Sequence, residues 1–283
     1  MIDVIKDTLF DSIKLLPFLF LAYLLMEYLE HKTGNKTKDI VKKSGKLGPL
    51  WGGIIGIFPQ CGFSAAAANL YAGKIITMGT LIAVFLSTSD EMLPILISEA
   101  APASLIFKIL AIKLVVGIIA GFIIDLVIRA TGKNKKVEPE EAVGHMCEHD
   151  HCDCEHGIFK SALKHTINIF IFITIITFAI NTLIHFIGEE TIEKAIAGVP
   201  VLGILVSSIF GLIPNCAGSV IITELYLSNL ISFGSMIAGL LVGSGIGILV
   251  LFKSNKNIKE NLTITGLLML VGIIVGLIID FVI

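Results

Sequence analysis

Charged residues are scarce in this 283-residue sequence: they make up only 16 % of the chain, whereas hydrophobic residues make up 55 %. That composition is too apolar for an ordinary soluble domain. The formal net charge of −2 gives no electrostatic reason to expect binding to nucleic acid. The sequence also lacks a GxxxxGK[ST] phosphate-binding motif, so we do not expect ATP hydrolysis within this chain.

Long apolar stretches are abundant instead, and several reach the roughly 20 residues that a helix needs to cross a bilayer. They cover residues 8–29, 76–98, 103–128, 165–187, 230–252 and 262–283. None has the alternating pattern of a membrane barrel strand, so we expect helices. The first stretch is not followed by a small-residue cleavage site and carries Glu27 and Glu30 near its end. We therefore expect a retained helix and not a signal peptide.

The two halves of the chain repeat each other at a constant offset of 155 residues. PQCGFS (59–64) corresponds to PNCAGS (214–219), and VGIIAGFIIDLVI (116–128) corresponds to VGIIVGLIIDFVI (271–283). One register held over this length indicates an internal duplication, as in many transporters. The predicted parts are a first membrane repeat, a cytoplasmic His/Cys-rich loop and a second membrane repeat, over residues 1–130, 131–160 and 161–283.

Each repeat contains a segment broken by proline and glycine. In the first repeat the break separates two apolar pieces, 47–58 and 61–72, each roughly 18 Å long as a helix and too short for a hydrocarbon core of about 30 Å. The segment could be one kinked spanning helix or a re-entrant hairpin that returns to its own side. We prefer the hairpin, because it places all the lysine-rich loops on one side, which the positive-inside rule identifies as the cytoplasm.

The sequence thus predicts an all-α polytopic membrane protein built from two inverted repeats. Each repeat has three spanning helices and a broken re-entrant helical hairpin, which makes about ten helical segments in all. The hairpin tips would enter from opposite sides and approach each other near the middle of the membrane, where irregular backbone is tolerated if it lines a cavity. We expect a multi-pass protein of the cell membrane.

Two acidic residues, Asp90 and Glu91, lie inside the apolar run 76–98. A charge at the centre of a bilayer is costly, so such residues usually face a cavity and mark an ion or substrate path. The pair could bind a divalent cation such as Mn²⁺, or one carboxyl could carry a proton. They could instead lie at a helix end near the surface. The second repeat has Gly245 and Ile246 at the matching positions, which predicts one asymmetric site.

Other polar residues near the breaks are candidates for the same transport site. Glu224, in register with Asn69, could supply a carboxylate from the second repeat. Small residues could also be ligands, although they more often serve close packing in such helices. These smaller candidates are Ser64, Thr88, Ser219 and Ser244. Asp125 and Asp280 also match each other, and for this pair we favour a structural role in capping or helix contact.

Cys61 and Cys216 stand at equivalent positions of the two hairpin tips. If they face each other in a cavity, they would bind a thiophilic metal or metalloid. As structural residues they would simply be small and buried. Gln60 and Asn215 directly precede the two cysteines and would line the tips beside them.

Between the repeats, the segment GHMCEHDHCDCEHG concentrates imidazole and thiol groups. These are His145, Cys147, His149, His151, Cys152, Cys154 and His156. Such density is compositional evidence for metal binding, but the spacing matches no zinc finger, so we do not expect a fixed structural site. The ligand set favours zinc, nickel, cobalt, copper or cadmium over manganese. We expect this loop to capture, deliver or sense metal in the cytoplasm, where thiols stay reduced.

PQCGFSAAAANLYAGKIITMGTLIAVFLSTSDEMLPIL (59–96) and PNCAGSVIITELYLSNLISFGSMIAGLL (214–241) resemble the ten-helix heavy-metal exporters, also described as manganese or arsenic efflux permeases. The resemblance covers essentially the whole chain except the His/Cys loop. It implies a transporter that exports metal ions, manganese or another heavy metal or metalloid, from the cytoplasm. We expect a secondary, ion-coupled carrier and no enzyme.

On this interpretation the partners are the lipid bilayer and the metal substrate, with no nucleic acid, and homo-oligomer formation is left open. No cofactor is required, and transition-metal ions are bound by the loop or as substrate. Two other classes of protein remain as alternatives. A membrane metal sensor or channel would need the loop but no alternating access. An intramembrane metalloenzyme could use the same carboxylates and cysteines.

Overall fold

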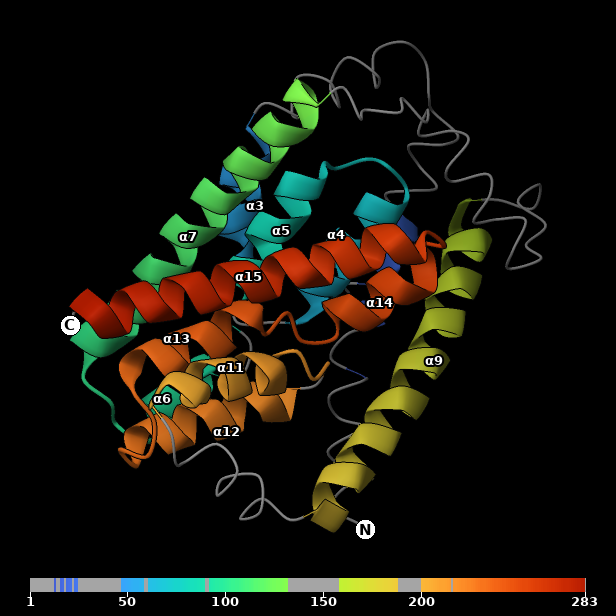
Figure 1. The fold of residues 1–283 in the computed structure, drawn as a ribbon. Coiled ribbons are helices and arrows are strands. Elements are labelled where there is room, and N and C mark those ends of the chain that lie inside the picture. The colour runs from blue at the N-terminus through green and yellow to red at the C-terminus, as the bar shows by residue number, and fades with distance from the viewer. Residues whose placement is uncertain are drawn as a thin grey trace.

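The computed structural model describes the chain in several stretches, and every regular element within them is a helix (Figure 1). The described residues are 13, 16–17, 19–21, 23–24, 47–58, 61–89, 92–131, 158–187, 200–214 and 216–282. Within them, 5 helical stretches are long and apolar enough to cross a membrane. The predicted class, an all-α polytopic membrane protein, is confirmed.

The helices follow the same order in both halves of the chain. The first half contains α3 (Gly48–Gly56), α4 (Cys61–Ala72), α5 (Met78–Ser87), α6 (Met92–Ser98) and α7 (Ala103–Ala130). The second contains α9 (Ile158–Ile187), α11 (Pro200–Gly211), α12 (Cys216–Leu227), α13 (Phe233–Val242), α14 (Gly247–Ser254) and α15 (Ile258–Val282). A shift of 155 residues superimposes the bounds of α4 on those of α12, and the bounds of α5 on those of α13. The sequence duplication is therefore also a duplication of helices.

Helices α5 and α13 begin in the same way. Thr77 caps α5 by accepting a hydrogen bond from the Thr80 amide at 3.1 Å, and Ser232 caps α13 by accepting one from the Ser235 amide at 3.1 Å. A hydroxyl at this position satisfies one of the amides that lack an intrahelical partner.

A carboxylate from the last helix of each half completes the cap. Asp125 accepts hydrogen bonds from the Thr77 hydroxyl at 2.7 Å and the Gly79 amide at 2.9 Å. Asp280 accepts them from the Ser232 hydroxyl at 2.5 Å and the Gly234 amide at 2.8 Å. A negative charge is favourable at a helix N-terminus. The structural role expected for this pair of aspartates is confirmed.

Two of the predicted spanning stretches, 76–98 and 230–252, do form helical stretches of membrane length, Met78–Ser98 and Phe233–Ser254, but each of them is interrupted. The backbone leaves the helical conformation at Thr88 (φ −56°, ψ 129°) and at Gly243 (φ −65°, ψ 94°). The Thr88 hydroxyl donates to the Val84 carbonyl at 2.7 Å, beside the bond that the Thr88 amide makes to the same carbonyl at 3.0 Å. In the second half Gly245 adopts φ 54°, a left-handed conformation that glycine adopts without a steric penalty. Each span consequently consists of two short helices.

Glycines let the helices of each half pack closely. A Cβ atom on Gly79 would collide with the carbonyl of Gly121 across the α5–α7 contact, and one on Gly234 would collide with that of Gly276 across the α13–α15 contact. Small residues allow this close approach of helix backbones in membranes. Helices α3, α5 and α7 thereby form one compact trio, and α11, α13 and α15 form a second.

Helix α3 runs parallel to α5, because its start lies beside the start of α5 and its end beside the end. Gly48 packs against Thr80, and Gly56 packs against Ser87. The chain must return to the level at which α3 begins before α5 can start, and α4 is the segment that makes this return. This geometry is the one expected of a hairpin and differs from that of a single kinked helix over 47–72.

The short helices cross from one half to the other. Helix α14 packs mainly against α4, and α6 packs against α12, so each half covers a helix of its partner. One hydrophobic core includes residues of both halves, among them the fully buried Phe85 and Leu241. In Figure 1, α7 runs from the lower left to the top of the view, whereas α15 runs from right to left.

Candidate functional site

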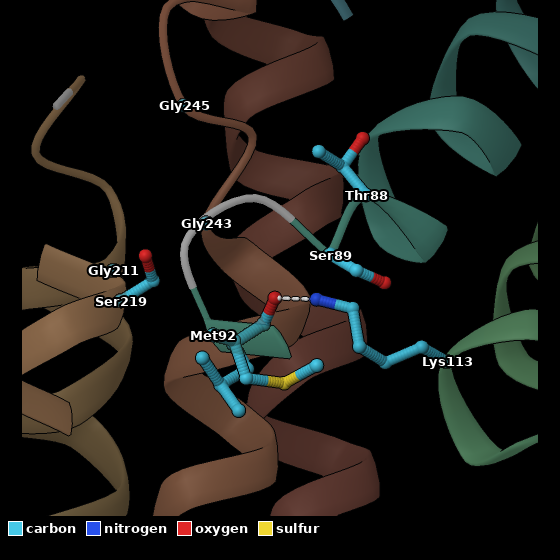
Figure 2. A pocket seen from close by; sticks show the side chains of 9 residues that line it. Thr88, Ser89, Met92, Lys113, Gly211, Ser219, Gly243 and Gly245 are labelled. Carbon is cyan, nitrogen blue, oxygen red and sulfur yellow. Dashed lines mark hydrogen bonds between the residues drawn. The ribbon is translucent and has the colours of Figure 1, made fainter. Parts of the chain in front are cut away.

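The two helix interruptions meet at a small cavity (Figure 2). Thr88 and Ser89 line it from the break between α5 and α6, and Gly243 and Gly245 line it from the break between α13 and α14. Its volume of about 10 Å³ is room for roughly one water molecule. Because both halves contribute their irregular backbone, the cavity lies where a transporter built from repeats would hold its substrate.

Lys113 brings a cationic side chain to this cavity from the middle of α7 (Figure 2). It is 1 % exposed, and its ammonium group donates a hydrogen bond to the Leu240 carbonyl in the last turn of α13. The carbonyls of a last turn lack intrahelical partners and carry the negative end of the helix dipole. The ammonium therefore caps the interrupted helix of the opposite half.

Several hydroxyl groups surround the same region. Thr88, Ser89 and Ser219 line the cavity, and the Ser89 hydroxyl donates to the Ser87 carbonyl at 3.3 Å. Ser244 lies between the two lining glycines of the second break, and its buried hydroxyl has no hydrogen-bond partner among the described residues. The region thus holds an unused hydrogen-bonding group as well as a charge.

The structure brings some of the predicted site residues together and separates others. Thr88 and Ser219 line the cavity, and Ser64 is fully buried beside Gly247, the first residue of α14. Glu224 is exposed on α12.

Asn69 lies in a different contact between the two halves. Its side-chain oxygen accepts hydrogen bonds from the Tyr23 hydroxyl at 3.1 Å and from the Ser254 hydroxyl at 2.7 Å. Its buried side-chain nitrogen has no partner in the part of the chain that the structure describes. Asn69 therefore links α4 to α14 away from the cavity lining.

Other predicted site residues fall outside the description. Cys61 and Cys216 are the first residues of α4 and α12, and their side chains are not described. Gln60, Asp90, Glu91, Asn215 and the metal-loop residues His145, Cys147, His149, His151, Cys152, Cys154 and His156 lie outside the described residues. Among the described residues, no group of three or more His, Cys, Asp or Glu side chains could hold a metal ion.

Lys113 is the charged residue of the lining, and the sequence analysis did not single it out. The signal was present, because Lys113 interrupts the apolar run 103–128 and the matching position of the second repeat is Leu268. The rule that singled out Asp90 and Glu91, a charge inside an apolar run, applies equally to this lysine.

A second polar cluster joins the two halves outside the cavity. The Glu260 carboxylate on α15 accepts a hydrogen bond from the Tyr71 hydroxyl on α4, and it lies 3.3 Å from the ammonium of Lys74. The Asn255 side chain also donates to Glu260, at 3.3 Å. These contacts tie the end of α4 to the start of α15, next to the contact that Asn69 makes with Ser254.

A comparison with known protein families identifies the family of this chain. A family model described as "Putative, 10TM heavy-metal exporter" matches residues 1–181 and 165–283. The chain belongs to this heavy-metal exporter family. Together with its apolar spans, membership makes it a multi-pass protein of the cell membrane. No curated protein and no solved structure matches the chain. The suspected resemblance to these exporters is confirmed.

Proposed function

We propose that this exporter-family member carries heavy-metal ions or metalloids out of the cytoplasm as a secondary, ion-coupled carrier. The observation that carries the proposal is the meeting of two interrupted helices, one from each half, at a cavity lined by Lys113, Thr88 and Ser219. Broken helices that meet between repeats supply dipole ends and free backbone groups to substrates in transporters. A structural protein would have no comparable use for irregular backbone at this depth.

Alternating access would follow from helix movements within a pair of inverted repeats. The parallel course of α3 and α5 supports a re-entrant hairpin in each repeat, and with three further spans such a hairpin inverts the second repeat. On this proposal the cavity would open first to the cytoplasm and then to the outside.

The proposed ligands come from the sequence around the breaks. Asp90 and Glu91 come between Ser89 and Met92, two residues that line the cavity, and they would bind the cation or exchange protons. Cys61 and Cys216, with Gln60 and Asn215, would line the hairpin tips. Carboxylate ligands favour a hard cation such as Mn²⁺, whereas paired thiols favour a thiophilic metal or metalloid. The His/Cys loop would collect metal for export.

Metal content in cells that express the protein tests this proposal. The variants are Asp90→Asn with Glu91→Gln, Cys61→Ser with Cys216→Ser, a deletion of residues 145–156, and Glu99→Gln as a control carboxylate in an exposed turn. We expect the wild type and the control to lower the cellular content of at least one metal. Failure of the acid variant alone would indicate a hard cation, and failure of the cysteine variant alone a soft metal or arsenite. A wild type that changes no metal content would refute the exporter proposal.

Counterflow in proteoliposomes distinguishes a carrier from a channel. A carrier preloaded with unlabelled metal accelerates the uptake of labelled metal, because the loaded site returns faster than the empty one. A simple channel or a metal sensor shows no such acceleration. Turnover of an added substrate by protein that lacks the loop would support a metalloenzyme instead.

A further inference from the structure

Lys113 has a charge that packing at its position does not require. The equivalent residue of the second half, Leu268, is also completely buried in the core. An apolar side chain therefore satisfies the same place in the duplicated fold. Because a buried ammonium group is costly in a membrane, its charge points to a role in the cavity that it lines.

The Lys113 ammonium occupies a position suited to a cation. Helix α13 ends at Val242, so the Leu240 carbonyl belongs to its last turn. Carbonyls at the C-terminal ends of broken helices coordinate cations in transporters, and this carbonyl is the acceptor of the lysine hydrogen bond. In the present structure the Lys113 ammonium, a cationic group carried by α7, is thus already bound at the carboxyl end of the interrupted helix α13.

We propose that Lys113 is a specificity-determining residue that competes with the transported cation for the carboxyl end of α13. This inference rests on the proposed export of a cation through the cavity. The cavity holds roughly one water-sized occupant, so a metal ion inside it lies within a few ångströms of the ammonium. Two positive charges so close repel each other strongly where water is scarce. Lys113 therefore lowers the affinity of the cavity for the cation and speeds release of the cation. After release, the Lys113 ammonium occupies the position that the cation has left.

The competition depends on the charge of the substrate, so it distinguishes metal cations from uncharged substrates. A divalent cation such as Mn²⁺ experiences this repulsion from the ammonium of Lys113. Trivalent arsenite, a neutral hydroxide at neutral pH, does not. Removal of the charge is therefore expected to strengthen the binding of metal cations and to leave the handling of arsenite unchanged.

Titration of the purified full-length protein with Mn²⁺, with free ion detected by electron paramagnetic resonance, measures this effect. Lys113→Gln removes the charge but retains a donor for the Leu240 carbonyl, Lys113→Met removes both, and Lys113→Arg retains the charge. Leu268→Met is the control at the equivalent position. We expect Gln and Met to lower the Kd for Mn²⁺ at least about tenfold, and Arg and the control to stay near wild type. In proteoliposomes, Gln should lower both KM and the maximal rate for Mn²⁺, with KM for arsenite unchanged.

The outcomes separate the two proposals. Equal or weaker Mn²⁺ binding by Lys113→Gln, with transport by the wild type intact, would overturn the competition and leave the exporter proposal standing. An equal change in the KM for arsenite would also overturn it, because a structural defect acts on every substrate. Absence of Mn²⁺, Zn²⁺ and Cd²⁺ binding by the wild type would overturn both the competition and the export of metal cations. Lys113→Gln retains a donor for the Leu240 carbonyl at the end of α13. We therefore expect this variant to fold even if Lys113→Met does not fold.

Discussion

Asp125 and Asp280, 155 residues apart in the sequence, make the same two hydrogen bonds in the two halves of the fold. Each carboxylate accepts one bond from the N-cap hydroxyl of a neighbouring helix and one from a glycine amide two residues further on. Their surroundings differ, however, because Asp125 is 5 % exposed whereas Asp280 is exposed near the end of α15.

This difference predicts unequal costs for the same substitution. Asp125→Asn should destabilise the protein by about 1–2 kcal/mol, because it removes a buried charge-assisted cap at the start of α5. Asp280→Asn should cost clearly less, since water can replace the lost bond. Thermal unfolding of the purified protein in detergent checks the order of the two melting temperatures. A larger fall in melting temperature for Asp280→Asn than for Asp125→Asn would contradict the importance of burial for the strength of these caps.

Two glycine substitutions should have opposite effects on stability. Gly79→Ala places a methyl group against the Gly121 carbonyl and the Asp125 carboxylate, so α5 and α7 must separate and the melting temperature should fall. Gly266→Ala, in α15, meets no atom within 4 Å and should be neutral or stabilising by up to about 1 kcal/mol. Equal melting temperatures for the two variants would show that the α5–α7 contact is less tight than the structure has it.

Loss of the Glu260 charge should loosen the contact between α4 and α15. Glu260→Gln removes the ion pair with Lys74 and weakens the bond from Tyr71, at an expected cost of about 1–2 kcal/mol for these partly buried groups. Lys256→Gln is the control, because Lys256 is exposed four residues earlier. We expect a lower melting temperature and faster proteolysis for Glu260→Gln alone. Identical behaviour of the two variants would exclude a stabilising role for the cluster.

The orientation and metal binding of the central loop can be tested with its own thiols. In a background with Cys61 and Cys216 changed to serine, a membrane-impermeant maleimide should label the remaining loop cysteines in inside-out vesicles only. Zn²⁺ or Cd²⁺ should slow that labelling, because bound thiolates are not free to react. Labelling only in right-side-out vesicles would reverse the proposed topology. Labelling rates that do not change with metal would remove the loop from the metal pathway.

The duplication, the helical class and the capping role of Asp125 and Asp280 were predictable from sequence, because they depend on a register and on apolar runs that survive in both halves. The interruptions of the two spanning helices were not predictable from the sequence. Hydropathy averages over a run and does not register a local change of backbone conformation, such as those at Thr88, Gly243 and Gly245. A serine or threonine is tolerated in many membrane helices, so its presence alone does not indicate a break.

Individual roles within the site were harder still to predict. Thr88 and Ser219, two of the candidate residues, both line the cavity. Asn69 was grouped with them by register, yet its partners Tyr23 and Ser254 come from distant segments that no spacing rule connects. Lys113 acts on the Leu240 carbonyl, a backbone group, and a sequence does not reveal which carbonyl an interrupted helix leaves unpaired.

The exchange of short helices has a mechanical consequence. Because α14 packs on α4 and α6 packs on α12, the parts that can move as rigid units do not coincide with the first and second halves of the sequence. The two exchanged pairs, α4 with α14 and α6 with α12, would be such units, and the compact trios would form the frame around them. Displacement of the pairs would bend the chain at Thr88-Ser89 and at Gly243-Ser244. The two unwound segments would then be hinges as well as walls of the cavity, so a single motion would reshape the site and change the side from which it is reached.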